Sequence, residues 1–206
     1  MLRAINDHIL KDLSSKIVLL SGPRQAGKTT LAKSLYPEFE YLNYDSKPDQ
    51  RVIRAQNWGR KKPILILDEL HKMKNWKRFL KGIYDTEDLK QKIIVTGSAR
   101  MEIARRMGDS LAGRHFSYTL YPLTMRELND ETAIDSNFTK LLHLGGFPEP
   151  FLKGDEKFAA RWRIAHLDII LRQDLLDLEQ IRRVGDLETL LDLLRVRRSS
   201  SRSENS

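Results

Sequence analysis

The sequence has no cysteine, and its five histidines lie far apart without a His-Glu-x-x-His pair. Disulfides, thiolate catalysis and cysteine-based zinc sites are therefore excluded. Long apolar runs are also missing, because the longest, residues 17–20 and 64–67, are strand-sized and far below the ~18 residues that cross a bilayer. The first residues lack the basic-then-apolar pattern of a secretory signal. We expect a cytoplasmic protein without a membrane partner.

What is present describes an ordinary globular chain: 206 residues, of which 40% are hydrophobic and 31% charged. The net charge of +8 suggests an anionic partner. Many basic residues alternate with acids, as on a solvated helix face. The basic clusters could therefore contact nucleic acid, contact an acidic protein partner, or only keep the surface hydrated. They lie at residues 60–62, 100–106, 182–183 and 195–198.

The first ~110 residues alternate strand and helix patterns, which predicts an α/β fold with a parallel sheet covered on both faces. After Pro122 the patterns are helical, and the Arg/Ser-rich end is low in complexity. We expect an ATPase-like core at 1–122, a small C-terminal helical subdomain at 123–196 and a disordered tail at 197–206. The predicted strands are 16–20, 40–44, 64–67, 92–96 and 116–121, and the predicted helices of the core are 2–13, 29–35, 45–58, one around 76–83, and 99–107.

Residues 22–29 satisfy the P-loop (Walker A) pattern G-x-x-x-x-G-K-[ST] completely. The glycines let consecutive N–H groups point at phosphate oxygens, and the following helix adds its positive end. Lys28 can reach the β- and γ-phosphates, and the Thr29 hydroxyl can ligate Mg²⁺. We therefore predict ATP and Mg²⁺ as cofactors. The predicted nucleotide-binding residues are Gly22, Pro23, Arg24, Gln25, Ala26, Gly27, Lys28 and Thr29.

The apolar run 64–67 ends in two acids. Asp68 fits the Walker B carboxylate that holds Mg²⁺, so Thr29 and Asp68 are the predicted metal residues. Glu69 could polarise the water that attacks the γ-phosphate and would then be the general base of a hydrolase. The alternative for Glu69 is a surface acid in a salt bridge.

The sequence predicts two further sites. Thr96 and Ser98 end a buried strand, and they could sense the γ-phosphate if that strand lies between the P-loop and Walker B strands; otherwise they form an ordinary turn. Arg114 could stabilise transition-state charge on a phosphate of its own or a neighbouring subunit, or form a structural ion pair. Arg100 is a second candidate for the same role.

A Gly pair and two prolines occur at residues 145–150. This composition predicts a rigid irregular turn between helices. The turn could lie over the adenine and report the nucleotide state to the helical part, or it could be a plain loop.

The order of these motifs, GPRQAGKTT, LILDELHKMKNWKRFLKGIYD, IVTGSAR, LAGRHFSYTLYPLTMREL and GGFPEPFL, resembles the prokaryotic AAA-type ATP-binding proteins. The chain is also similar to archaeal ATPases of the STAND-like signalling group. The resemblance implies a P-loop NTPase of the additional-strand class with strand order 5-1-4-3-2. It also implies ATP binding that extends to Thr30. Family members typically run to nearly twice this length, so we expect a truncated or frameshifted end.

Three functions follow from these observations. The first is a slow Mg-dependent ATPase whose cycle moves the helical part, aided by a protein partner or a second copy of the chain. The second is a nucleotide-switched DNA- or protein-binding module with incidental turnover. The third is a small-molecule kinase, which Glu69 beside Asp68 disfavours because a kinase does not need to activate water.

Overall fold

The computed structural model describes residues 3–87, 91–98, 111–128, 133–170 and 193. The predicted helix 99–107, Arg100, the pattern beyond residue 170 and the tail 197–206 lie outside the described residues. The chain forms two compact units, Met1–Gly154 and Asp155–Ser206.

The first unit is built on a five-stranded sheet in the order β2-β3-β4-β1-β5, with every pair parallel. Read from the other edge, this is the predicted order 5-1-4-3-2, which is confirmed. All residues of β1 and β3 are buried, because the sheet is covered on both faces and a continuous apolar run suits such a strand. The strands are β1 Ile17–Ser21, β2 Glu40–Asn43, β3 Ile64–Asp68, β4 Lys92–Thr96 and β5 His115–Thr119.

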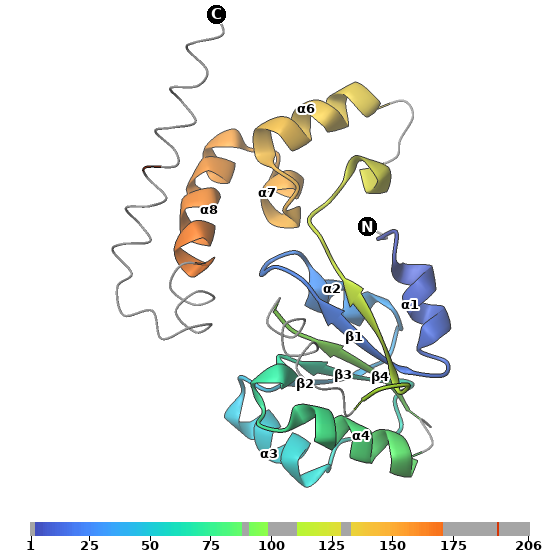
Figure 1. The fold of residues 1–206 in the computed structure, drawn as a ribbon. Helices are drawn as coiled ribbons and strands as arrows, with labels where there is room; N and C mark the ends of the chain where they lie inside the picture. Colours follow the sequence, from blue (N-terminus) through green and yellow to red (C-terminus); the bar gives the residue numbers. More distant parts are fainter. Residues whose placement is uncertain (1–2, 88–90, 99–110, 129–132, 171–192, 194–206) are drawn as a thin grey trace, which may run out of the picture. The chain divides into compact units, whose positions relative to one another are not determined.

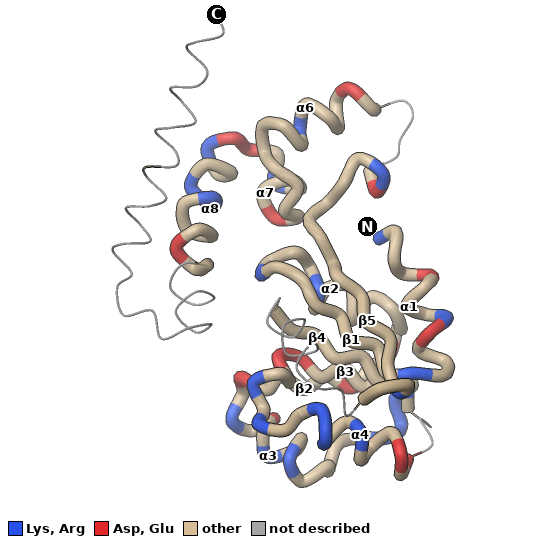
Figure 2. Tube along the Cα trace, viewed as in Figure 1, with Lys and Arg blue, Asp and Glu red and all other residues tan. Residues whose placement is uncertain are grey.

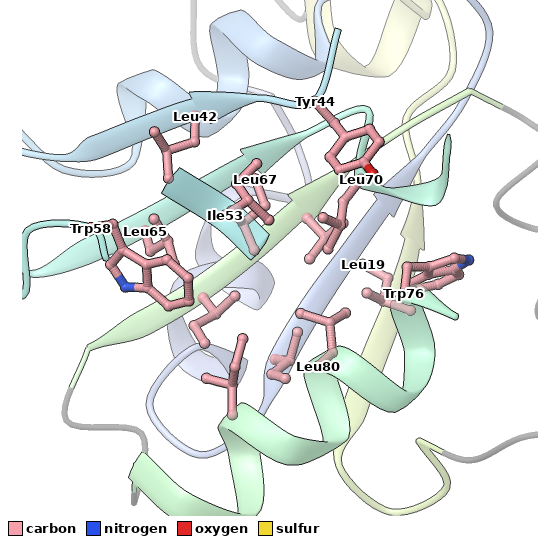
Figure 3. Close-up of a cluster of buried hydrophobic side chains, with 14 of the residues drawn as sticks. Leu19, Leu42, Tyr44, Ile53, Trp58, Leu65, Leu67, Leu70, Trp76 and Leu80 are labelled. Carbon is pink, nitrogen blue, oxygen red and sulfur yellow. The ribbon is translucent and has the colours of Figure 1, made fainter. Parts of the chain in front are cut away.

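Two pairs of helices cover the two faces of the sheet (Figure 1). One face packs on α1 (Asn6–Asp12) and α2 (Lys28–Ser34), and the other packs on α3 (Lys47–Ala55) and α4 (Trp76–Glu87). Successive strand residues point to opposite faces, so β1, β3 and β4 contribute side chains to both cores. Figure 3 shows the second core, where Leu19 and Leu65 of the strands meet Leu80 of α4.

The segment after β5 consists of short helices. They are η2 Met125–Leu128, α6 Ile134–Leu144 and α7 Pro148–Lys153. Another one-turn helix, η1 Leu70–Lys72, follows β3. The prediction that residues 145–150 are wholly irregular is wrong, because α7 begins at Pro148. Proline is tolerated in the first helical turn, where its missing N–H has no partner to lose.

The second unit contributes α8 (Glu156–Ile169) to the described residues. The Asp155 side chain caps this helix by accepting a hydrogen bond from the Phe158 N–H at 2.9 Å. The compact units divide after Gly154, whereas the predicted core ends at residue 122. The proposed division into core, helical subdomain and tail stays a prediction.

Neither unit's described helices include one with the length and apolar character of a membrane span. Of the predicted basic clusters, residues 60–62 lie in the described part. There, Arg60 pairs with Glu87 at 2.7 Å and Lys62 pairs with Glu38 at 2.8 Å. Figure 2 shows that α3 and α4 carry both basic and acidic residues, which suits a solvated surface.

Candidate functional site

The loop between β1 and α2 requires glycine at its start. Gly22 has a φ of 146°, and a Cβ placed there would lie 2.2 Å from the carbonyl oxygen of Leu120. Gly27 has a φ of 94° and forms the N-cap of α2. Both glycines of the P-loop pattern therefore take backbone conformations that L side chains rarely adopt.

Lys28 is buried beneath this loop. Its ammonium group donates hydrogen bonds to the carbonyl oxygens of Gly22 at 3.0 Å and Pro23 at 2.7 Å. The cation is thus held at the base of the loop that precedes it. Of the other predicted binding residues, Ala26 is buried, Pro23 and Arg24 are half-buried, and Gln25 and Thr30 are exposed.

The carboxylate of Asp68, at the end of β3, accepts hydrogen bonds from hydroxyl groups of three elements. Oδ2 accepts hydrogen bonds from the Thr29 hydroxyl and the Tyr41 hydroxyl, each at 2.9 Å. Oδ1 accepts a hydrogen bond from the Thr96 hydroxyl. The predicted metal residues Thr29 and Asp68 therefore lie together, although 39 residues separate them. Their hydroxyl and carboxylate oxygens are hard ligands of the kind that Mg²⁺ takes, so the donor set fits this ion.

Tyr41 is a contact that sequence reasoning missed. It lies on β2, next to β3 in the sheet, with Tyr41 and Ile66 in register. Burial, followed by the hydrogen bond to Asp68, raises the pKa of the Tyr41 hydroxyl, so this hydroxyl stays a proton donor to Asp68. The only signal in the sequence was the alternating pattern of the strand, which placed Tyr41 without naming its partner.

Glu69 follows Asp68 in a left-handed conformation with a φ of 56°. Its N–H donates to the carbonyl oxygen of Thr96 at 2.9 Å, which fixes the turn. The Oε2 atom is buried and accepts no hydrogen bond within the described part of the chain, but it lies 3.5 Å from the Lys72 ammonium and 3.7 Å from His71 Nε2. Burial raises the pKa of Glu69, and the charge of Lys72 opposes that shift. Left-handed non-glycine residues concentrate at functional sites.

The strand β4 lies between β1 and β3, which is the condition set for a sensor role of Thr96 and Ser98. Thr96 is fully buried and contacts Asp68, and the Ser98 hydroxyl lies 3.3 Å from His71 Nε2. Both residues therefore join the network around Asp68 and Glu69. The sensor role itself stays a prediction. His71 is a further residue that sequence reasoning missed.

Arg114 does not join this network. It directly precedes β5 and therefore lies at the amino edge of the parallel sheet, whereas the P-loop follows the carboxyl end of β1. Its guanidinium forms a bidentate ion pair with Asp85, at 2.7 and 3.2 Å. The prediction that Arg114 contacts a nucleotide phosphate bound by the same chain is therefore corrected. Arg114 forms a structural ion pair with Asp85 at the opposite edge of the sheet.

The Gly-Gly-Phe-Pro segment packs against the P-loop. The N–H of Leu123 donates to the carbonyl oxygen of Gly146 at 2.6 Å, and a Cβ on Gly146 would lie 2.5 Å from the Leu123 carbonyl oxygen. On the other side, a Cβ at Gly27 would lie 3.7 Å from Cγ of Pro148. The turn therefore reaches the second glycine of the loop.

A parallel sheet of this order, with this loop after β1, defines a P-loop NTPase. The family described as "AAA domain" matches residues 14–129, more than half of the chain, and the chain belongs to that family. The fold is similar to that of the Walker-type ATPase of Pyrococcus abyssi, with a TM-score of 0.52 and 17% identity over 88% of this chain and 75% of that one. Family and fold together support an ATP-binding NTPase.

Curated relatives are longer proteins. An uncharacterized protein of Methanocaldococcus jannaschii is 24% identical, covering 93% of this chain and 49% of the relative. An uncharacterized protein of Mycobacterium tuberculosis is 26% identical, covering 79% of this chain and 36% of the relative. The chain thus spans less than half the length of these relatives.

Proposed function

We propose that this chain binds Mg-ATP at residues 22–30 and hydrolyses it slowly. The main support for this proposal is the hydrogen bond between Thr29 and Asp68 at 2.9 Å. Thr29 directly follows the buried Lys28 in the sequence. This hydrogen bond brings the P-loop pattern and the end of β3 together from distant parts of the sequence. Thr29 and Asp68 would hold Mg²⁺, which when bound neutralises charge on the phosphates.

Glu69 is the proposed general base. A base must accept a proton from the attacking water, and a carboxylate with a raised pKa accepts it more readily than an ordinary one. The left-handed turn, tied to Thr96 by the Glu69 N–H, fixes the residue next to the metal-binding Asp68. Lys72, at 3.5 Å, compensates its charge without a close hydrogen bond.

We expect the intrinsic rate to be low. An arginine that stabilises transition-state charge accelerates phosphoryl transfer by orders of magnitude, and Arg114 of the same chain is occupied by Asp85 at the far edge of the sheet. We propose that a protein partner or a second copy of the chain supplies that charge. Hydrolysis would then depend on assembly.

The position of Pro148, whose Cγ atom lies 3.7 Å from where a Cβ on Gly27 would be, favours a switching function. It links the P-loop to the α6–α7 segment, so that binding of nucleotide could bias the position of those helices. In this form the chain is an ATPase whose cycle drives a conformational change. The alternative is a nucleotide-switched module for DNA or protein in which turnover is incidental.

Glu69→Gln tests the assignment of the base. We expect the variant to bind Mg-ATP normally but to hydrolyse it at least ~100-fold more slowly, because general bases contribute about that much. Single-turnover hydrolysis with excess protein measures this directly. Glu87→Gln, on α4 at the Arg60 pair, is the control and should keep the wild-type rate. Equal rates in wild type and Glu69→Gln would remove Glu69 from the role and favour incidental turnover.

A further inference from the structure

A buried ion pair links the start of the chain to the segment after β5. The Arg3 side chain donates from Nε to Glu127 Oε1 at 2.7 Å and from Nη2 to Oε2 at 3.1 Å, across 124 residues. Both side chains are only 8% exposed. Glu127 also accepts from the N–H groups of Ala4 and Thr124. A bidentate pair of this kind fixes the plane of the guanidinium group.

The same guanidinium group contacts the P-loop. Nη1 donates to the carbonyl oxygen of Ala26 at 3.2 Å, and Nη2 also donates to the carbonyl oxygen of Tyr121 at 2.6 Å. Arg3 therefore joins the P-loop, the exit of β5 and η2 (Met125–Leu128).

The contact with Ala26 has a consequence for the next residue. The peptide unit is planar and trans, so the Ala26 carbonyl and the Gly27 N–H point in opposite directions. Holding the carbonyl on one side fixes the direction of the N–H on the other. In the proposed function, this N–H is one of the groups that face the phosphates.

Residues 121–128 also contact the loop by a second route. Leu123 hydrogen-bonds Gly146, and the turn after Gly146 brings Pro148 to Gly27. The segment is thus tied to Ala26 through Arg3 and reaches Gly27 through the turn. A change in the backbone of the loop would therefore alter the geometry at both places.

We propose that Arg3, held by Glu127, is a positioning residue that orients the Gly27 N–H for phosphate and couples nucleotide binding to residues 121–128. The inference rests on the proposed binding of Mg-ATP by the loop. It adds a role for Arg3 and Glu127, which the sequence analysis did not predict as site residues.

The test compares Arg3→Gln and Arg3→Lys with the wild-type chain. Calorimetric titration with Mg-ATP, well below the unfolding temperature, should show binding about five- to tenfold weaker in Arg3→Gln, the usual effect of losing one or two such hydrogen bonds. Arg3→Lys keeps the charge but not the fork, so its affinity should fall between the two. Asp85→Asn breaks a bidentate arginine pair at the far edge of the sheet and should bind as wild type does.

A second readout separates positioning from mere stability. Saturating Mg-ATP should slow amide hydrogen exchange of residues 121–128 in the wild type but not in Arg3→Gln. If Arg3→Gln does not fold, Glu127→Gln, which keeps the shape of the contact, should bind Mg-ATP at least about twofold more weakly and show the same loss of response.

The outcomes are distinguishable. Wild-type affinity together with a wild-type exchange response in the Arg3 or Glu127 variants overturns the role of the pair and leaves the proposed function intact. A wild-type chain that does not bind Mg-ATP overturns both.

Discussion

Gly22 occupies a position that has no room for a side chain. Its φ is 146°, and a Cβ at this position would lie only 2.2 Å from the Leu120 carbonyl oxygen, so there is room for hydrogen alone. We expect Gly22→Ala to lower the free energy of unfolding by about 1–3 kcal/mol, because the loop or β5 must shift to relieve the clash. Thermal unfolding measures the loss.

Gly82→Ala is the matched control for that experiment. Gly82 lies inside α4, and an added Cβ would meet nothing within 4 Å. Alanine is the better helix former by about 1 kcal/mol, so the control should be as stable as wild type or more so. A Gly22→Ala chain with undiminished stability would contradict the described conformation of the loop.

At the residue scale, local motifs were predictable and long-range partners were not. Lys28 and Asp68 were found because phosphate and magnesium binding impose a fixed local pattern. Tyr41 and Arg3 were missed because they meet the site only through the folding of distant segments. His71 is close to Glu69 in the sequence, but its contact with Ser98 joins residues 27 positions apart. The place of Arg114 in the sequence could have excluded it from the nucleotide site of the same chain. A residue that precedes a parallel strand lies at the edge of the sheet opposite to the P-loop.

Among the elements, η2 depends on the charge of Glu127. Burial raises the pKa of this carboxyl group, but the hydrogen bond and charge of Arg3 outweigh burial, so the pKa lies below its ordinary value of 4.5. The folded state therefore binds this proton more weakly than the unfolded state. The resulting stabilisation is fully present above pH 4.5 and is lost as the pH falls through the lowered pKa.

This linkage predicts a specific difference in acid unfolding. The wild-type chain should lose stability below about pH 4.5 more steeply than Glu127→Gln, whose residue 127 does not titrate. Urea unfolding between about pH 3 and pH 7, followed by circular dichroism, measures both slopes. Parallel pH profiles for the two proteins would show that Glu127 contributes nothing to the acid limb.

Strands β1, β3 and β4 were predicted closely because each is a short, largely apolar run that ends in turn residues. β1 and β3 are buried along their whole length, so their short apolar runs show no competing helical periodicity. Boundaries of helices were less predictable. α3 was expected to run to about residue 58 but ends at Ala55, because Gln56 takes a left-handed conformation that sequence patterns do not reveal.

For the whole molecule, alternation of strands and helices predicted a parallel sheet, while the order of its strands came from the family resemblance. Periodicity alone does not say which strands are neighbours. The order matters for function, because it sets β4 between β1 and β3 and gathers Thr29, Asp68 and Thr96 at the carboxyl edge. Ligands of open α/β sheets bind at that edge.

We propose that the loop after β1 binds Mg-ATP through Lys28. The most direct measurement is the unfolding temperature of wild type and Lys28→Ala with and without Mg-ATP. At about 100 times the dissociation constant, a ligand that binds only the folded state stabilises it by about 2.7 kcal/mol. We expect a clear rise in unfolding temperature for the wild type and none for Lys28→Ala. Equal protection of both proteins, or of neither, would contradict it.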